Sequence, residues 1–448
     1  PYTTLFRSRW YSGSGLYRHV DLLVGEAAHI APRGVYVTTP KAAAEGSEVL
    51  VETTLGNLGA ATGVTLEQRV LDEAGQVVAR TSEDLVLTQE AVMSQRLSVA
   101  PAALWSLECP ALYTLSTRLL QDGDVLDEVE TAFGIRSIEV DAVEGFRLNG
   151  QPLKLLGGCV HHDNGPLGAA SYDAAEWRKV ALHKDAGFNA IRCAHNPPAE
   201  AMLDACDHLG ILVIDEAFDY WREGKKPYDL HMTFDSRWRD DMRDMILRDR
   251  NHPCVIAWST GNEIGERDGR SDGYAYSRKL ADYARSLDAT RFINSAICGI
   301  FEDLTSLDEM EKTAPTPERD PWGDKTEAYA APLDIVGYNY LWSRYDYDGQ
   351  RFPGRVICGT ESKPMEAFDN WSRIERLPYV IGDFVWTSLD YLGESGIGRV
   401  DYGPADGPAP FVAPYPWHLA YCGDLDICGV ARPQMAYKQI LWRQRRTP

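Results

Sequence analysis

The chain has 448 residues, of which 44% are hydrophobic and 25% charged, the balance of a globular protein with length for two or three domains. Its 45 basic and 66 acidic side chains give a net charge of −21, which excludes nucleic acid as a favoured partner. No apolar run approaches the roughly 20 residues that span a bilayer, and the first residues lack a signal peptide. We therefore expect no membrane partner and a cytoplasmic location.

The first residues differ in character from the rest of the chain. Residues 1–8 read like a cloning or assembly scar, and we exclude them from the fold. Residues 16–24 predict one strand, which follows a turn-rich Ser-Gly-Ser-Gly run at 12–15. Because an isolated strand cannot bury its own face, we interpret residues 9–30 as the remnant of a domain that lay further upstream.

Short β-rich runs separated by turns characterise residues 31–140. The runs at 34–39, 48–55, 65–71, 94–99 and 113–120 are bounded by turn signals such as Asn57 and Asp122-Gly123. Five or more strands in about 100 residues, with alternating apolar and polar side chains, predict an immunoglobulin-like β-sandwich.

Apolar strand-like runs alternate with helical stretches in residues 141–448. The strands are expected at 153–160, 190–193, 211–214, 255–258, 293–297, 335–338, 356–358 and 381–386, with helices at 173–186, 199–209, 235–250 and 274–287. Eight buried strands, most followed by helices, predict a closed (β/α)8 TIM barrel. A doubly wound open sheet is the structural alternative, but no Gly-rich phosphate fingerprint follows the first strand.

The nine cysteines are scattered without CxxC pairs, so we expect reduced thiols rather than a disulfide framework. Cys422 and Cys428 are close in sequence, but no paired set of histidines or cysteines accompanies them. We therefore predict neither a bound metal nor a cofactor.

Polar residues follow almost every predicted barrel strand, where TIM barrels carry their active sites. In chain order they are His161, His162, Asp163, Arg192, His195, Asn196, Asp215, Glu216, Asn262, Glu263, Asn339, Tyr340, Glu361, Trp386 and Asp390. Carboxylates, imidazoles, amides and aromatic rings that converge on one mouth suit the hydrolysis of a sugar bond. Each carboxylate or histidine taken alone has a plainer alternative as a loop or helix-capping residue.

Two of these carboxylates, Glu263 and Glu361, follow strands that lie nearly opposite each other in such a barrel. Retaining hydrolysis needs a nucleophilic carboxylate and an acid placed about 5 to 5.5 Å apart on either side of the glycosidic bond. The acid has to keep its proton near neutral pH, which burial and the neighbouring nucleophile favour. The pair therefore predicts a two-glutamate retaining mechanism.

Four motifs in the expected order resemble glycoside hydrolase family 2, and the likeness covers almost the whole chain from Arg9. They are Trp-Ser-Thr-Gly-Asn-Glu at 258–263, Cys-Gly-Thr-Glu-Ser at 358–362, Trp-Tyr-Ser-Gly-Ser-Gly-Leu-Tyr-Arg at 10–18, and the run from Phe384 to Glu394. The third motif resembles the end of the family's N-terminal sugar-binding jelly roll. The fourth resembles its β-galactosidase-like branch, so the resemblance implies an N-terminally truncated member of that branch.

The resemblance also implies roles for individual residues. Glu263 is the implied acid/base and Glu361 the nucleophile. The implied sugar-binding and supporting residues are Asn262 at the 2-hydroxyl, His162 and His195 at other hydroxyls, Arg192 and Tyr340 beside the nucleophile, and Trp386 as the apolar floor. Asp215 and Asn339 complete the predicted substrate-binding set.

The expected function is hydrolysis of terminal β-D-galactosides, with a carbohydrate as the only predicted partner and homo-oligomer formation left open. A β-glucuronidase is one alternative. The chain lacks an Asn-x-Lys element for a uronic carboxylate, although Lys363 offers a substitute. A non-catalytic carbohydrate-binding remnant is the other alternative, because most of the jelly roll is missing.

Overall fold

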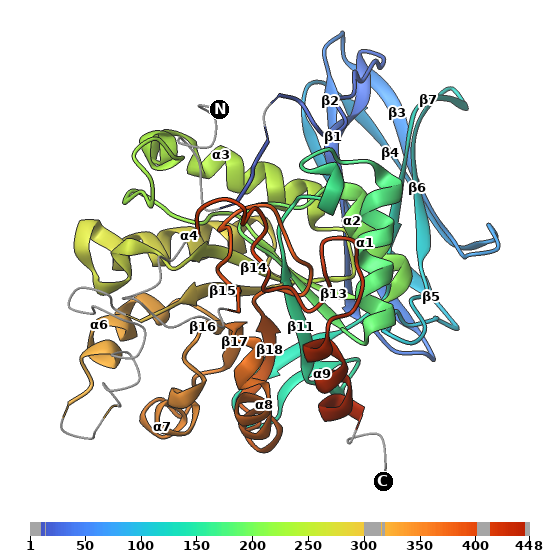
Figure 1. Ribbon diagram of the computed structural model, residues 1–448. Coiled ribbons are helices and arrows are strands. Elements are labelled where there is room, and N and C mark those ends of the chain that lie inside the picture. The colour runs from blue at the N-terminus through green and yellow to red at the C-terminus, as the bar shows by residue number, and fades with distance from the viewer. Residues whose placement is uncertain (1–9, 14, 300–314, 316–318, 401–412, 444–448) are drawn as a thin grey trace.

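The computed structural model describes residues 10–13, 15–299, 315, 319–400 and 413–443 (Figure 1). The predicted scar at 1–8 lies outside these residues. In the part of the chain that the structure describes, no helix has both the length and the hydropathy to cross a bilayer. All nine cysteines are free thiols.

Two antiparallel sheets form the N-terminal sandwich, as predicted. One sheet has the order β1-β2-β5 and the other β4-β3-β6-β7. The strands are β1 (Ala28–Lys41), β2 (Ser47–Asn57), β3 (Thr62–Leu71), β4 (Val77–Leu87), β5 (Ala91–Val99), β6 (Tyr113–Gln121) and β7 (Asp124–Phe133). Alternation in β2 buries Val49, Val51 and Leu55 against Leu66 and Leu115 of the facing sheet. Each sheet thereby covers the apolar face of the other.

Strands β4 and β7 were not among the runs predicted from the sequence. Both lie at the edges of their sheet, and most of their side chains are exposed or half-buried. Their many charged residues, as in Asp-Val-Leu-Asp-Glu-Val-Glu at 124–130, remove the alternation that marks a strand in a sequence. Charged edge strands also discourage pairing with other chains.

The C-terminal unit is a closed barrel of eight parallel strands, which confirms the predicted fold class. A small sheet of β8 (Ile138–Asp141), β9 (Gly145–Leu148) and β10 (Gln151–Pro152) precedes it. The barrel strands are β11 (Leu155–Val160), β12 (Ala190–Cys193), β13 (Leu212–Glu216), β14 (Val255–Asn262), β15 (Phe292–Ile297), β16 (Ile335–Asn339), β17 (Ile357–Ser362) and β18 (Val380–Val385).

Helices surround the barrel strands on the outside (Figure 1). They are α1 (Asp173–Ala186), α2 (Glu200–Leu209), α3 (His231–Asp249), α4 (Gly273–Leu287), α6 (Pro321–Ala330), α7 (Tyr345–Arg351), α8 (Ala367–Arg376) and α9 (Pro433–Arg443). Every residue of β12, β14 and β17 is buried, because the barrel interior covers one face of each strand and the helices cover the other.

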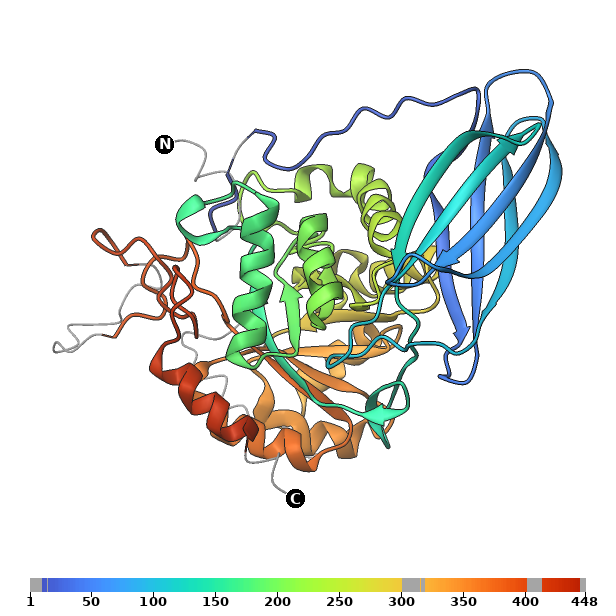
Figure 2. The ribbon, with the colours of Figure 1, turned by 90° about the vertical axis from the view of Figure 1, so that its right-hand side faces the viewer.

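The sandwich packs beside the barrel (Figure 2). Its contacts with the barrel lie near the amino-terminal ends of β14 and β15. Trp105 donates its indole N–H to the carbonyl oxygen of Asp207 at 2.8 Å. Tyr36 of β1 donates its hydroxyl to Asp288 at 2.7 Å, and Asn251 pairs with the backbone of β1. These contacts leave the carboxyl ends of the strands, where the site lies, away from the sandwich.

The strand expected at residues 16–24 is absent from the structure. This segment is a coil that runs from the barrel mouth to the sandwich (Figure 2), and Leu16, Leu22 and Val24 are 87–88% exposed. The run of apolar residues is typical of a strand, but no other strand among the described residues pairs with this segment. Farther upstream, Trp10 forms a bridge with Gly393 beside the barrel mouth.

Candidate active site

The predicted site residues lie at the carboxyl ends of the barrel strands. Arg192 is on β12, Asn262 ends β14 with Glu263 just after it, Asn339 ends β16 with Tyr340 just after it, Glu361 is on β17, and Trp386 follows β18. Parallel strands bring their carboxyl ends to one face of a barrel, so residues far apart in the sequence meet there. A continuous set of hydrogen bonds connects the polar residues of this set, and Trp386 stacks on His195.

Arg192 is fully buried at the centre of this network. Its Nη1 donates to Oε1 of Glu361 at 2.9 Å and to the carbonyl oxygen of Thr360 at 3.1 Å. Its Nη2 donates to Oδ1 of Asn262 at 2.9 Å. Nε and Nη2 also donate to the Glu216 carboxylate at 2.8–3.1 Å. One guanidinium therefore fixes two carboxylates and an amide.

Glu216 binds both Arg192 and His195. Burial alone would raise the pKa of Glu216, but the Arg192 charge and the hydrogen bonds from His195 and Ser259 outweigh it and lower that pKa. The ionised carboxylate accepts from His195 Nδ1 at 2.7 Å, which leaves Nε2 of the ring 3.8 Å from Oε1 of Glu361. His195 thereby faces the same carboxylate as Arg192.

Two amides link the two glutamates. Nδ2 of Asn339 donates to Oε1 of Glu263 at 3.2 Å and to Oδ1 of Asn262 at 2.9 Å. The Thr360 hydroxyl donates to Oδ1 of Asn339 at 2.7 Å, which sets the orientation of that amide. Asn262 is itself fully buried, and its Nδ2 donates to Asp219 at 2.9 Å. Glu263 and Glu361 thus belong to one hydrogen-bonded unit.

Tyr340 lies between the two glutamates. Its backbone N–H donates to the Glu361 carbonyl oxygen at 2.7 Å. Burial raises the pKa of the Tyr340 phenol well above its usual value, and the charges of Glu361 and Glu263 and a side-chain hydrogen bond to Glu361 add to the effect. The phenol therefore stays protonated and donates to Glu361. Glu263 and Tyr340 both adopt positive φ (46° and 57°), a backbone state that is uncommon for non-glycine residues.

An aromatic cluster forms one side of the site. The rings of Trp386 and His195 stack with centroids 5.2 Å apart and 3° between their planes. His161 meets Trp386 edge to face at 5.1 Å and stacks on Trp10 at 4.4 Å, and Tyr391 packs against both His161 and Trp386. Trp10 thus brings a residue from far upstream into contact with the barrel mouth.

Two predicted substrate-binding residues do not join this cluster. Asp215 faces Asp249 of α3 instead, and burial together with the charge of that carboxylate raises the pKa of Asp215 well above its usual value. His162 lies against the N-terminal segment, 3.3 Å from the Ser12 carbonyl oxygen and 5.4 Å from the Tyr17 ring. Successive strand residues point to opposite sides, so Glu216 and His161 occupy the inward positions that the prediction gave to Asp215 and His162.

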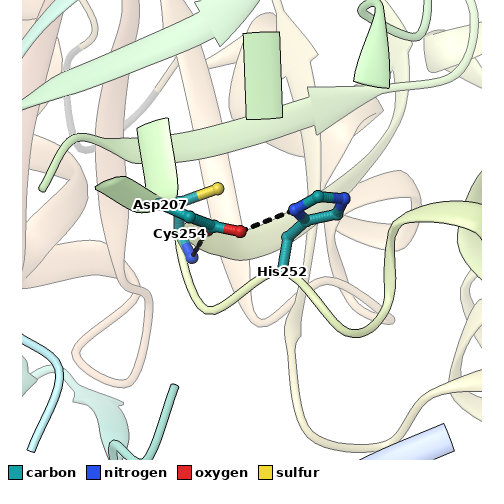
Figure 3. A group of neighbouring side chains, drawn as sticks. All are labelled: Asp207, His252 and Cys254. Carbon is teal, nitrogen blue, oxygen red and sulfur yellow. Dashed lines mark hydrogen bonds and ion pairs between the residues drawn. The ribbon is translucent and has the colours of Figure 1, made fainter. Parts of the chain in front are cut away.

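One group of three metal-ligand side chains, Asp207, His252 and Cys254, lies elsewhere among the described residues (Figure 3). It lies beside Trp105, which connects the two domains. Asp207 accepts from Nδ1 of His252 at 2.6 Å and from the Cys254 backbone N–H at 2.9 Å. Burial raises the pKa of the Cys254 thiol well above its usual value. Both carboxylate oxygens are thus engaged and the thiol is neutral, which makes the group a hydrogen-bonded clamp.

The sequence matches known proteins over nearly all of the described chain. The model described as "Glycosyl hydrolases family 2" matches residues 28–136, and the family's TIM barrel domain matches residues 138–332. Fold and sequence place the chain in the class of barrel glycoside hydrolases. Within that class, it belongs to glycoside hydrolase family 2.

Relatives include a β-galactosidase of Bacteroides ovatus, 31% identical over 97% of this chain and 56% of the relative. A putative β-glucuronidase of Formosa agariphila is 30% identical over 98% of this chain and 43% of its own length. A family 2 structure from Bacteroides cellulosilyticus is 42% identical with a TM-score of 0.88, covering 97% of this chain and 53% of that one. The chain therefore spans about half the length of the relatives it matches.

Proposed function

We propose that the protein is a retaining exo-β-glycosidase that hydrolyses terminal non-reducing β-D-galactosyl residues. The network that joins Glu361 through Arg192, Asn262 and Asn339 to Glu263 carries this proposal. Both carboxylates lie at the mouth of a TIM barrel, which is where enzymes of this fold carry out their chemistry. Besides the substrate and one water molecule, the proposed mechanism uses only the protein's own side chains.

In the first step, Glu361 attacks the anomeric carbon while Glu263 protonates the departing glycosidic oxygen. In the second step, Glu263 removes a proton from water, which displaces Glu361 and releases the sugar with its original anomeric configuration. Arg192 and Tyr340 hold Glu361 by charge and hydrogen bonding, so the nucleophile stays ionised and oriented. Trp386 offers an apolar face for the sugar ring.

Two lysines near the mouth support a neutral sugar over a uronic acid. Lys225 donates to Asp219 at 2.5 Å, and Lys363 pairs with Glu366 at 3.2 Å. A uronic carboxylate would have to compete with these carboxylates for either cation. A β-glucuronidase is the alternative, because relatives of the chain from Formosa agariphila and Bacteroides fragilis carry that name.

The test is the release of nitrophenol from a panel of β-glycosides by the wild type, Glu361→Gln, Glu263→Gln and the exposed control Glu327→Gln. We expect galactoside turnover that is lost in Glu361→Gln and unchanged in the control. Azide should restore turnover to Glu263→Gln with an activated substrate, because it attacks the glycosyl enzyme without a general base. Preference for the glucuronide would replace the galactosidase assignment. Binding of sugar without any turnover would favour the alternative of a non-catalytic carbohydrate-binding remnant.

A further inference from the structure

A cavity of about 220 Å³ lies between the sandwich and the barrel, far from the site described above. Val37 of β1 and Phe133 of β7 line it on the sandwich side, and Pro253 and Thr290 line it on the barrel side. Pockets for drug-sized ligands measure about 300–1,000 Å³, so this space suits a compact molecule. Two arginines, Arg136 and Arg291, face it together with Ser137.

Arg136 is a buried cation that forms no ion pair with any described carboxylate. The residue is 8% exposed, and its guanidinium donates through Nε to the Pro253 carbonyl oxygen and through Nη2 to that of Val255, both at 2.8 Å. Among the residues that the structure describes, no carboxylate oxygen lies within the 4.0 Å of an ion pair with it. Buried charges in proteins are ordinarily paired, so we expect an anion to lie beside this guanidinium.

The neighbouring charged side chains do not neutralise the Arg136 guanidinium. Arg291 donates through Nε to the same Val255 carbonyl oxygen at 3.1 Å, which brings a second guanidinium close to Arg136. Asp288 is occupied by Arg291, Tyr36 and other donors. Burial and the charge of Arg291 together lower the pKa of Arg136 to about 9, a direction that marks a destabilised cation.

We propose that this cavity binds a small oxyanion, inorganic phosphate or a small carboxylate, against the Arg136 guanidinium and the Ser137 hydroxyl. Only two of the five N–H donors of Arg136 are used by the carbonyl oxygens, so donors remain for a planar, two-point contact with an oxyanion. Because the cavity is lined by both domains, a bound anion connects the sandwich to the barrel and stabilises the joint.

The test is saturable binding to the whole protein, measured by calorimetry and thermal unfolding at constant ionic strength. Phosphate and acetate are titrated separately, with chloride as the reference salt, so that the two sources of the oxyanion are distinguished. We expect one site per chain and a rise in Tm of about 3 °C at a hundredfold excess over Kd. The general stabilising effect of phosphate is measured in the variants and subtracted.

Arg136→Met should abolish the binding, whereas Arg80→Met, on an exposed edge strand, should not. Ser137→Asp provides a second variant if Arg136→Met does not fold, because it places a carboxylate in the cavity. This aspartate should pair with Arg136, raise the Tm without added anion and abolish the response to phosphate. Absence of saturable binding of either anion to the wild type, or equal binding to Ser137→Asp, would overturn the proposal.

Discussion

Replacement of Arg192 by methionine removes the cation between two buried carboxylates. Arg192 makes charged hydrogen bonds to Glu216 and Glu361, and none of the three side chains is more than 3% exposed. Removing one partner of a buried pair costs about 3–5 kcal/mol, because the remaining charge stays in a medium of low polarity. We expect the free energy of unfolding to fall by about that amount, measured by urea denaturation at pH 7.

The same change should alter the pH dependence of catalysis. Without the adjacent cation the Glu361 carboxylate becomes harder to ionise, so the acidic limb of the kcat/KM profile should move to higher pH. Glu216→Gln in the Arg192→Met background removes the buried Glu216 charge that has lost its partner, and it should recover part of the lost stability. A loss below about 1 kcal/mol, the value of an ordinary hydrogen bond, with an unmoved acidic limb, would refute this account of the network.

Three further predictions concern groups outside the two glutamates. Burial and the Asp249 carboxylate raise the pKa of Asp215 well above its usual value, so the wild type loses stability as pH rises above about 4. Asp215→Asn should therefore gain more Tm over the wild type at pH 8 than at pH 5, and a constant difference would contradict this. Burial disfavours the His252 cation, but Asp207 outweighs it and raises the pKa of His252 above 6.5. The resulting stability is present below pH 6.5 and lost above the raised value, so the advantage over His252→Gln in urea should shrink from pH 6 to pH 9. Trp10→Ala removes a stacking partner worth about 0.5–1.5 kcal/mol and should lower kcat/KM up to roughly tenfold; an unchanged kcat/KM would separate this ring from catalysis.

The barrel strands could be predicted from the sequence because runs such as those at 211–214 and 255–258 are apolar throughout and bounded by helical stretches. The same unbroken apolar character gives no sign of which side chains face the inside of the barrel. A strand buried on both faces carries no alternation of apolar and polar residues, so neither Asp215 nor Glu216 is marked as the inward residue. His161 and His162 pose the same problem at the end of β11.

Contacts between segments far apart in the chain could not be predicted from the sequence either. Trp10 was recognised within a motif, but nothing in that motif indicates that its ring stacks on His161. Asp219 lies in the loop after β13, and its contact with Asn262 depends on the path of that loop. The charged edge strands β4 and β7 were missed for a different reason, since solvent on one side and few buried residues leave little pattern to detect.

The coil between Trp10 and the sandwich acts as a tether. The segment that carries Trp10 is held at the mouth by the hydrogen bond from the Tyr11 N–H to the Leu392 carbonyl oxygen and by Arg18 on Pro197. Covalent connection gives such contacts a high effective concentration, typically in the millimolar range for short flexible linkers. A protease cut in the exposed stretch around Leu22 would make the docking of Trp10 a binding equilibrium between two separate chains. Dilution would then dissociate the segment that carries Trp10 from the barrel mouth.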